Sequence, residues 1–230
     1  MKTFLILAAG RGSRFGGDKL LEPINGLTLP QRCALFALAN GAERLCVTVS
    51  RDSVLTNGSA IYHPVVEDIR RAVDHKVDVE VSFQAVGSYG PGAAITAWEG
   101  KIKDDFTVLF GDNLYEGQLP EFNPTKTYFS YKTLGVDPRN FQLAAVVNKY
   151  IVEKPHVFIK GDFFCGFAHF PKTFFEGLPA LQRSSRDEYE ITDMINLAKD
   201  VETVDLDELG LKWADITYKS DIEVLEAMTS

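Results

Sequence analysis

Short apolar runs alternate with segments of helical spacing through the first half of the chain. Residues Thr3–Ala8 form an apolar run that leads into a glycine-rich stretch, as in a parallel strand buried on both faces. Residues 29–40 have helical spacing and stop at Gly41, which is typical of a helix end. Similar patterns predict strands over residues 44–50, 77–83 and 106–110, and helices over residues 63–73 and 93–98.

The pattern changes after residue 120, where strands dominate. We expect these strands to extend the main sheet and to form a small β-rich lobe over its edge. The expected strands are residues 127–131, 142–147, 163–170 and 211–216, and the expected helices are residues 188–198 and 220–228.

Strand–helix alternation predicts an α/β fold of the Rossmann-like type, with three layers (α/β/α) around a mixed, mostly parallel central sheet. Right-handed crossovers place the loops after the parallel strands along one edge, where ligands bind in such folds. The length of 230 residues suits a single domain, so we expect residues 1–230 to form one unit.

Charge and hydropathy limit the classes of partner that this chain is expected to bind. The formal net charge of −8 argues against a general nucleic-acid binder, but a nucleotide can be held by local basic groups and a divalent cation. No stretch approaches the roughly 20 apolar residues of a membrane helix, and the apolar start is too short for a signal peptide. We therefore expect a cytoplasmic protein with neither nucleic acid nor membrane as its partner.

Residues 7–19 combine glycines with three cations, Arg11, Arg14 and Lys19. Successive backbone N–H groups in such a loop bind anions, and a triphosphate is the natural ligand. Phe15 stands where a dinucleotide fingerprint needs glycine, and Leu20 stands where a P-loop needs Ser or Thr. The loop is a different phosphate site, with a structural turn as the alternative.

Two aspartates, Asp112 and Asp215, lie at the ends of two expected strands. Magnesium takes one or two carboxylates together with phosphates and waters, so carboxylates from two strand ends would suit it. Turn or cap aspartates are the alternative interpretation.

The segment Leu7-Ala-Ala-Gly-x-Gly-Ser-Arg, followed by Lys19-Leu-Leu-x-Pro23-Ile and Gly26, resembles the signature of the sugar-1-phosphate nucleotidylyltransferases. The resemblance implies that a nucleoside triphosphate and a sugar 1-phosphate are condensed to an NDP-sugar and pyrophosphate. It also implies a nucleotide-binding part over residues 1–120 and a sugar-binding, closing part over residues 121–230.

The same resemblance assigns roles within the site. Arg14 and Lys19 would contact the triphosphate, and Asp112 and Asp215 would bind Mg²⁺, although Ile216 replaces the family's glycine. Lys154 would approach the sugar phosphate. Nucleotide contacts would come from Ala9, Gly10, Gly12, Gln84 and Gly90, and further sugar contacts from Glu153 and Gly166.

The expected mechanism is in-line attack of an acceptor phosphate oxygen on the α-phosphorus. That oxygen is already anionic near neutral pH, so catalysis would rest on positioning and charge neutralisation. Arg14 and Lys19 would offset charge on the leaving pyrophosphate, and Lys154 would hold the nucleophile. Asp112 and Asp215 would hold Mg²⁺ against the α-phosphate. Two alternatives stay open: a cytidylyltransferase acting on a non-sugar phosphate of the choline-phosphate type, and a non-catalytic nucleotide-sugar sensor. A homo-oligomer is also left open.

Overall fold

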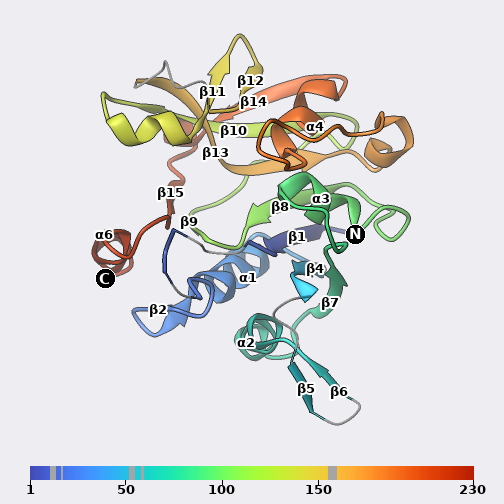
Figure 1. Cartoon of the computed structure of the whole chain (residues 1–230), viewed down its shortest axis with the longest axis vertical. Coiled ribbons are helices and arrows are strands. Elements are labelled where there is room, and N and C mark those ends of the chain that lie inside the picture. The colour runs from blue at the N-terminus through green and yellow to red at the C-terminus, as the bar shows by residue number, and fades with distance from the viewer. Residues whose placement is uncertain (11–13, 17, 52–54, 58–59, 155–159) are drawn as a thin grey trace.

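The computed structural model describes residues 1–10, 14–16, 18–51, 55–57, 60–154 and 160–230. Within these residues a nine-stranded mixed sheet has helices on both faces, which confirms the expected α/β fold (Figure 1). No helix in the described ranges is both long and apolar enough to cross a bilayer.

The part of the sheet formed by the first half of the chain is parallel. Strand β1 (Thr3–Ala8) lies between β4 (Arg44–Val49) and β8 (Phe106–Phe110), and β4 pairs in parallel with β7 (Asp78–Phe83). The carboxyl ends of these strands therefore face the same edge.

Strand β1 explains the layering, because successive side chains point to opposite faces. Phe4 and Ile6 enter one core cluster, whereas Leu5 and Leu7 enter another, and all four side chains are buried. The first cluster includes α1 (Leu29–Ala39) and α2 (Pro64–Val73), and the second includes α3 (Pro91–Thr96) and α4 (Ile191–Leu197).

The second half of the chain continues the sheet from β8. Strand β13 (Gly161–Phe170) runs antiparallel to β8 and is buried over most of its length. The strands beyond it are β10 (Thr127–Leu134), β11 (Ala144–Val147), β12 (Tyr150–Val152) and β14 (Val201–Asp205).

A separate two-stranded ladder joins distant parts of the chain. Strand β15 (Lys212–Asp215) pairs antiparallel with β9 (Asn113–Glu116), and Asp215 is opposite Asn113. Helix α6 (Asp221–Met228) follows. The remaining elements are β2 (Pro23–Ile24), β3 (Leu27–Thr28), β5 (Leu55–Asn57), β6 (Ala60–Tyr62), α5 (Leu206–Leu209) and the 3-10 helices η2 (Pro138–Gln142) and η3 (Phe174–Gly177).

Two expected elements start two or more residues later than the sequence indicates. The helix expected from residue 188 begins at Ile191, because the preceding backbone bonds elsewhere: Tyr189 N–H donates to the carbonyl of Tyr89 at 2.8 Å. The strand expected from residue 142 begins at Ala144, because η2 occupies the residues before it and is capped by Asp137.

Candidate active site

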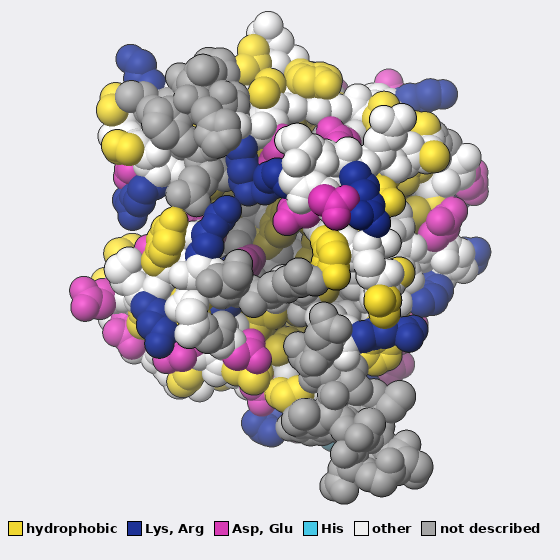
Figure 2. Space-filling model, viewed as in Figure 1, with side chains coloured by type: hydrophobic (Ala, Val, Ile, Leu, Met, Phe, Trp, Pro, Cys, Tyr) yellow, Lys and Arg dark blue, Asp and Glu magenta, His cyan; other side chains and the backbone are white. Residues whose placement is uncertain are grey.

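A cleft of about 720 Å³ lies at the carboxyl ends of β1, β7 and β8. Figure 2 shows this face hollowed near its centre, with charged side chains around the hollow. Nine of the residues singled out in the sequence line this cleft: Ala9, Gly10, Arg14, Lys19, Gln84, Gly90, Asp112, Lys154 and Asp215.

Two other described residues, Glu153 and Gly166, do not join this lining. Gly12 lies outside the described residues. Glu153 precedes Lys154 but is not part of the cleft wall, and neither is Gly166, which lies within β13.

Asp112 is placed by close contact between β1 and the turn after β8. Gly111 N–H donates to the carbonyl of Leu7 at 2.9 Å, and a Cβ on Gly111 would come within 2.8 Å of that oxygen. Only glycine allows this approach without displacement. This contact places Asp112 next to the carboxyl end of β1.

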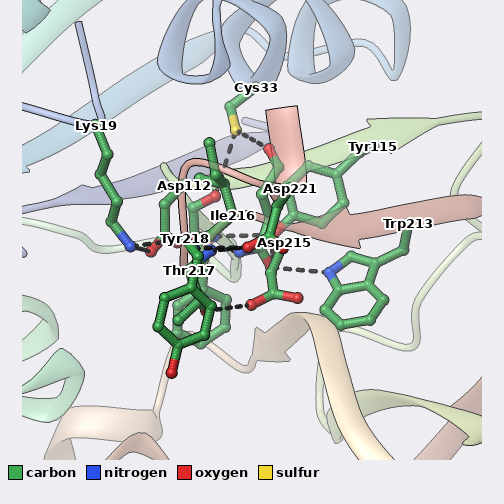
Figure 3. A network of polar contacts seen from close by, with 12 residues as sticks. Lys19, Cys33, Asp112, Tyr115, Trp213, Asp215, Ile216, Thr217, Tyr218 and Asp221 are labelled. Carbon is green, nitrogen blue, oxygen red and sulfur yellow. Dashed lines mark hydrogen bonds and ion pairs between the residues drawn. The ribbon is translucent and has the colours of Figure 1, made fainter. Parts of the chain in front are cut away.

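Asp215 reaches the same place from the end of β15. Its Oδ2 accepts a hydrogen bond from the Thr217 hydroxyl at 3.0 Å, and Ile216 N–H donates to the Asp112 carbonyl at 3.2 Å (Figure 3). Burial raises the pKa of the Asp215 carboxyl, and Asp112 raises it further. Two adjacent carboxylates with this electrostatic cost favour a bound cation.

Lys19 is the cation beside this pair. Its Nζ lies 2.5 Å from Asp112 Oδ2 and donates to the Ile216 carbonyl at 3.1 Å. The side chain is 14% exposed, so the charge acts in a partly buried setting where it is weakly screened.

Asn113 links the aspartates to the fold. Its Nδ2 donates to Asp112 Oδ1 at 3.0 Å, and its Oδ1 accepts from Trp213 Nε1 at 2.8 Å. The buried Tyr115 hydroxyl donates to the Gly166 carbonyl at 2.8 Å. Gly166 has a φ of 82°, and a Cβ there would lie 2.9 Å from Ser130 Oγ, so its observed role is in packing.

The opposite wall of the cleft carries both basic and acidic side chains. Lys154 lies there with Arg186, which the sequence patterns did not single out. Arg186 Nη2 lies 2.9 Å from Glu153 Oε1 and 2.7 Å from Glu190 Oε1, and the Thr192 hydroxyl donates to Glu153 Oε2 at 3.1 Å.

The surroundings of Glu153 and Lys154 shift the pKa values of both side chains. Burial raises the pKa of Glu153, with Glu190 as a further cause. Burial also lowers the pKa of Lys154, and Arg186 lowers it further. The local sequence gave little signal for Arg186, because an arginine among Asp and Glu is typical of a solvated surface.

The third wall is formed by the turn before α3. Gln84 Nε2 donates to the Gly90 carbonyl at 3.1 Å, so this amide fixes the turn as well as facing the cleft. Gly90 has a φ of 95° and a ψ of 164°, a region that is essentially restricted to glycine.

The donor set around the aspartates suits a hard divalent cation. Among the described residues no group of three or more His, Cys, Asp or Glu side chains could hold a metal. Magnesium uses one or two carboxylates and takes its other ligands from substrate phosphates and water, and Asp112 and Asp215 provide that number.

Comparison with known proteins places these features in context. Residues 4–112 match the MobA-like NTP transferase domain family. The UTP–glucose-1-phosphate uridylyltransferase AglF of Haloferax volcanii is 23% identical over 241 residues, covering 96% of this chain and 94% of the relative.

Solved structures share the fold. A protein assigned as a glucose-1-phosphate thymidylyltransferase from Bacillus anthracis superposes with a TM-score of 0.75 at 18% identity, covering 99% of this chain and 95% of the other. The inositol-1-phosphate CTP transferase of T. maritima gives 0.73 at 16% identity, covering 100% and 95%.

Proposed function

We propose that this chain, whose residues 4–112 match the MobA-like NTP transferase domain family, is a nucleotidyltransferase that condenses a nucleoside triphosphate with a sugar 1-phosphate and releases pyrophosphate. One observation carries the proposal: a single cleft gathers the loop cation Lys19, the pair Asp112 and Asp215, and the opposite cation Lys154.

The base and the triphosphate enter from the β1 and α3 sides. Ala9, Gly10, Gln84 and Gly90 surround the base, which packs against the turn fixed by the Gln84 amide. Arg14 and Lys19 neutralise the phosphates that become the leaving group, and the partial burial of Lys19 strengthens its effect.

Asp112 and Asp215 would hold Mg²⁺, which when bound offsets negative charge on the α-phosphate. Asn113 and Thr217 orient the two carboxylates through their hydrogen bonds. Because these supports are part of the β9–β15 ladder and the turn after it, the carboxylates are positioned before substrates arrive.

Lys154 and Arg186 hold the acceptor phosphate opposite the aspartates. One acceptor oxygen forms a bond to the α-phosphorus as the bond to the bridging oxygen of pyrophosphate breaks, and the electron pair leaves with pyrophosphate. A phosphate monoester is largely dianionic at neutral pH, so no side chain needs to remove a proton from the nucleophile.

A non-sugar acceptor is the second candidate. The Glu153 carboxylate is occupied by Arg186 and Thr192, and Gly166 contributes to packing, so neither presents a sugar contact in the cleft wall. The inositol-1-phosphate CTP transferase has the same fold.

Pyrophosphate release from a panel of substrates tests the proposal. UTP, dTTP, CTP, GTP and ATP would each be paired with glucose 1-phosphate, N-acetylglucosamine 1-phosphate, inositol 1-phosphate and choline phosphate. We expect release that requires Mg²⁺, one preferred base and a sugar 1-phosphate. Release only with choline phosphate or inositol 1-phosphate favours the second candidate, and nucleotide binding without any release favours a sensor.

Asp112→Ala should abolish magnesium-dependent pyrophosphate release while the protein remains folded, because the side chain is partly exposed and contributes little to the core. Thermal unfolding checks the fold, and Asp104→Ala, a change outside the cleft lining, is the control. Near-normal turnover of the Asp112 variant would refute the assigned role.

A further inference from the structure

A second groove of about 590 Å³ lies between η2 and α6 and opens beside the catalytic cleft. The two cavities share Leu143, Asp215 and Thr217 in their walls. Leu143 directly follows η2, and α6 follows Asp215 after a short turn. Each wall of the groove is thus connected along the chain to residues that also line the catalytic cleft.

Hydrogen bonds within each wall fix the groove. On one side Asn140 Nδ2 donates to the Gly135 carbonyl at 2.9 Å. On the other side Asp221 Oδ2 accepts from the backbone N–H groups of Thr217 and Tyr218 at 2.8 and 2.7 Å (Figure 3). A preformed concave site of this size is typical of small-molecule binding.

The surface that the groove offers is mainly apolar. Val136 and Val224 remain 67% and 59% exposed at its rim. The cations in its walls are ion-paired with neighbours, Lys132 with Asp207 and Arg139 with Asp137. Further apolar lining comes from Leu134, Trp213, Leu225 and Met228.

We propose that this groove binds an aliphatic substituent of the acceptor, so the acceptor is a sugar 1-phosphate carrying an acyl or comparable apolar group. The inference rests on the proposed function and adds the acceptor class. The phosphate is held at Lys154 and Arg186, the sugar ring passes Leu143 and Asp215, and the substituent lies between Val136 and Val224. Exposed apolar surface next to a catalytic cleft gains a specific role in this way.

The test compares acceptors that differ only in acyl length. Glucosamine 1-phosphates with N-acetyl, N-butanoyl and N-hexanoyl groups, and glucose 1-phosphates with the same groups on O6, would be assayed by pyrophosphate release. In one of the two series KM should fall about threefold or more for each methylene that becomes buried. The KM of the nucleoside triphosphate should not change.

Val224→Asp and Val136→Asp should remove this dependence on acyl length while leaving the KM of glucose 1-phosphate unchanged. Val147→Asp is the matched control, because Val147 is an exposed valine on β11 outside the groove. Pyrophosphate release that is independent of acyl length in both series, or unchanged dependence in the Val224 variant, overturns the groove assignment alone. Absence of release with every acceptor contradicts the proposed function itself.

Discussion

Lys154 lies just after β12 with a φ of 41°, a left-handed conformation that non-glycine residues rarely adopt. The conformation is found at a residue whose side chain is only 21% exposed and lies near both Arg186 and Glu153. Backbone strain of this kind persists where the surroundings hold it, and it is frequent at functional sites.

Because the pKa of Lys154 is lowered, we predict that acceptor binding weakens at a lower pH than it would with a lysine of ordinary pKa. Wild-type KM for the acceptor should rise as pH passes through a value below 10.5, because the neutral amine no longer attracts phosphate. Lys154→Arg should keep its charge and delay that rise. Measurements of KM from about pH 7 to about pH 10 check this, with the triphosphate KM as the internal control. A flat wild-type profile contradicts it.

At the scale of elements, the β9–β15 ladder brings the aspartates together. Its side-chain link is Asn113, which is buried and bridges Trp213 and Asp112. A buried amide that satisfies two partners has a larger effect when it is removed than a surface amide does.

Asn113→Leu should therefore lower the free energy of unfolding by about 1–3 kcal/mol and raise the magnesium concentration needed for half-maximal turnover. The reason is that Trp213 loses its acceptor and Asp112 loses its orienting donor. Denaturant unfolding and a magnesium titration measure the two effects. Asn123→Ala, at an exposed amide bonded to Thr125, should change neither, and equal effects of both variants would contradict the assignment.

A buried histidine on β13, His169, makes the stability of the protein depend on pH. His169 pairs with Thr107 across these strands, and burial lowers the His169 pKa to about 4 from 6.5. Between these values the unfolded chain binds the proton and the native protein does not, so stability falls as pH decreases through that range, by about 3 kcal/mol in total.

His169→Gln should reduce the decrease in the free energy of unfolding that occurs as pH falls. Unfolding free energies at about pH 7 and about pH 4.5 would give the difference for wild type and variant. His75→Gln, at an exposed histidine, is the control and should keep the wild-type slope. If the free energy of unfolding of the His169 variant depends on pH as strongly as that of the wild type, this histidine is not the cause.

Local patterns predicted some elements well and others not at all. The bounds of β1 and β8 agree with the sequence because both are short apolar runs, and the match of residues 4–112 confirms the family resemblance drawn from the loop. Strand β14 was missed because its half-buried residues show no alternation. Arg186 was missed because its place depends on the distant segment that brings it over the cleft.

At the scale of the molecule, the turn before α3 meets the segment before α4. Gly92 N–H donates to the Tyr189 carbonyl at 2.8 Å, and Tyr189 N–H donates to the Tyr89 carbonyl at 2.8 Å. A Cβ on Gly90 would lie 2.5 Å from the Tyr189 oxygen. Glycine at this position allows the two halves of the chain to close around the cleft.

Gly90→Ala should lower the free energy of unfolding by roughly 3 kcal/mol or more, since backbone strain and the clash with Tyr189 add together. It should also raise the KM of the nucleoside triphosphate. Gly100→Ala has a comparable φ of 74° with no atom within 4 Å of the new Cβ, and should cost only about 1–2 kcal/mol. Thermal melts and kinetics compare the two, and equal losses would exclude the contact with Tyr189 as the reason.

The ladder between β9 and β15 also has a consequence for biosynthesis. Asn113 and Trp213 are 100 residues apart, so β9 leaves the ribosome well before its partner strand exists. At the usual rate of elongation the delay is on the order of 5–20 s. During that interval the nascent chain can form its parallel strands, but the two carboxylates are not yet together. Nascent chains stalled before residue 212 should therefore bind nucleotide without being able to turn it over.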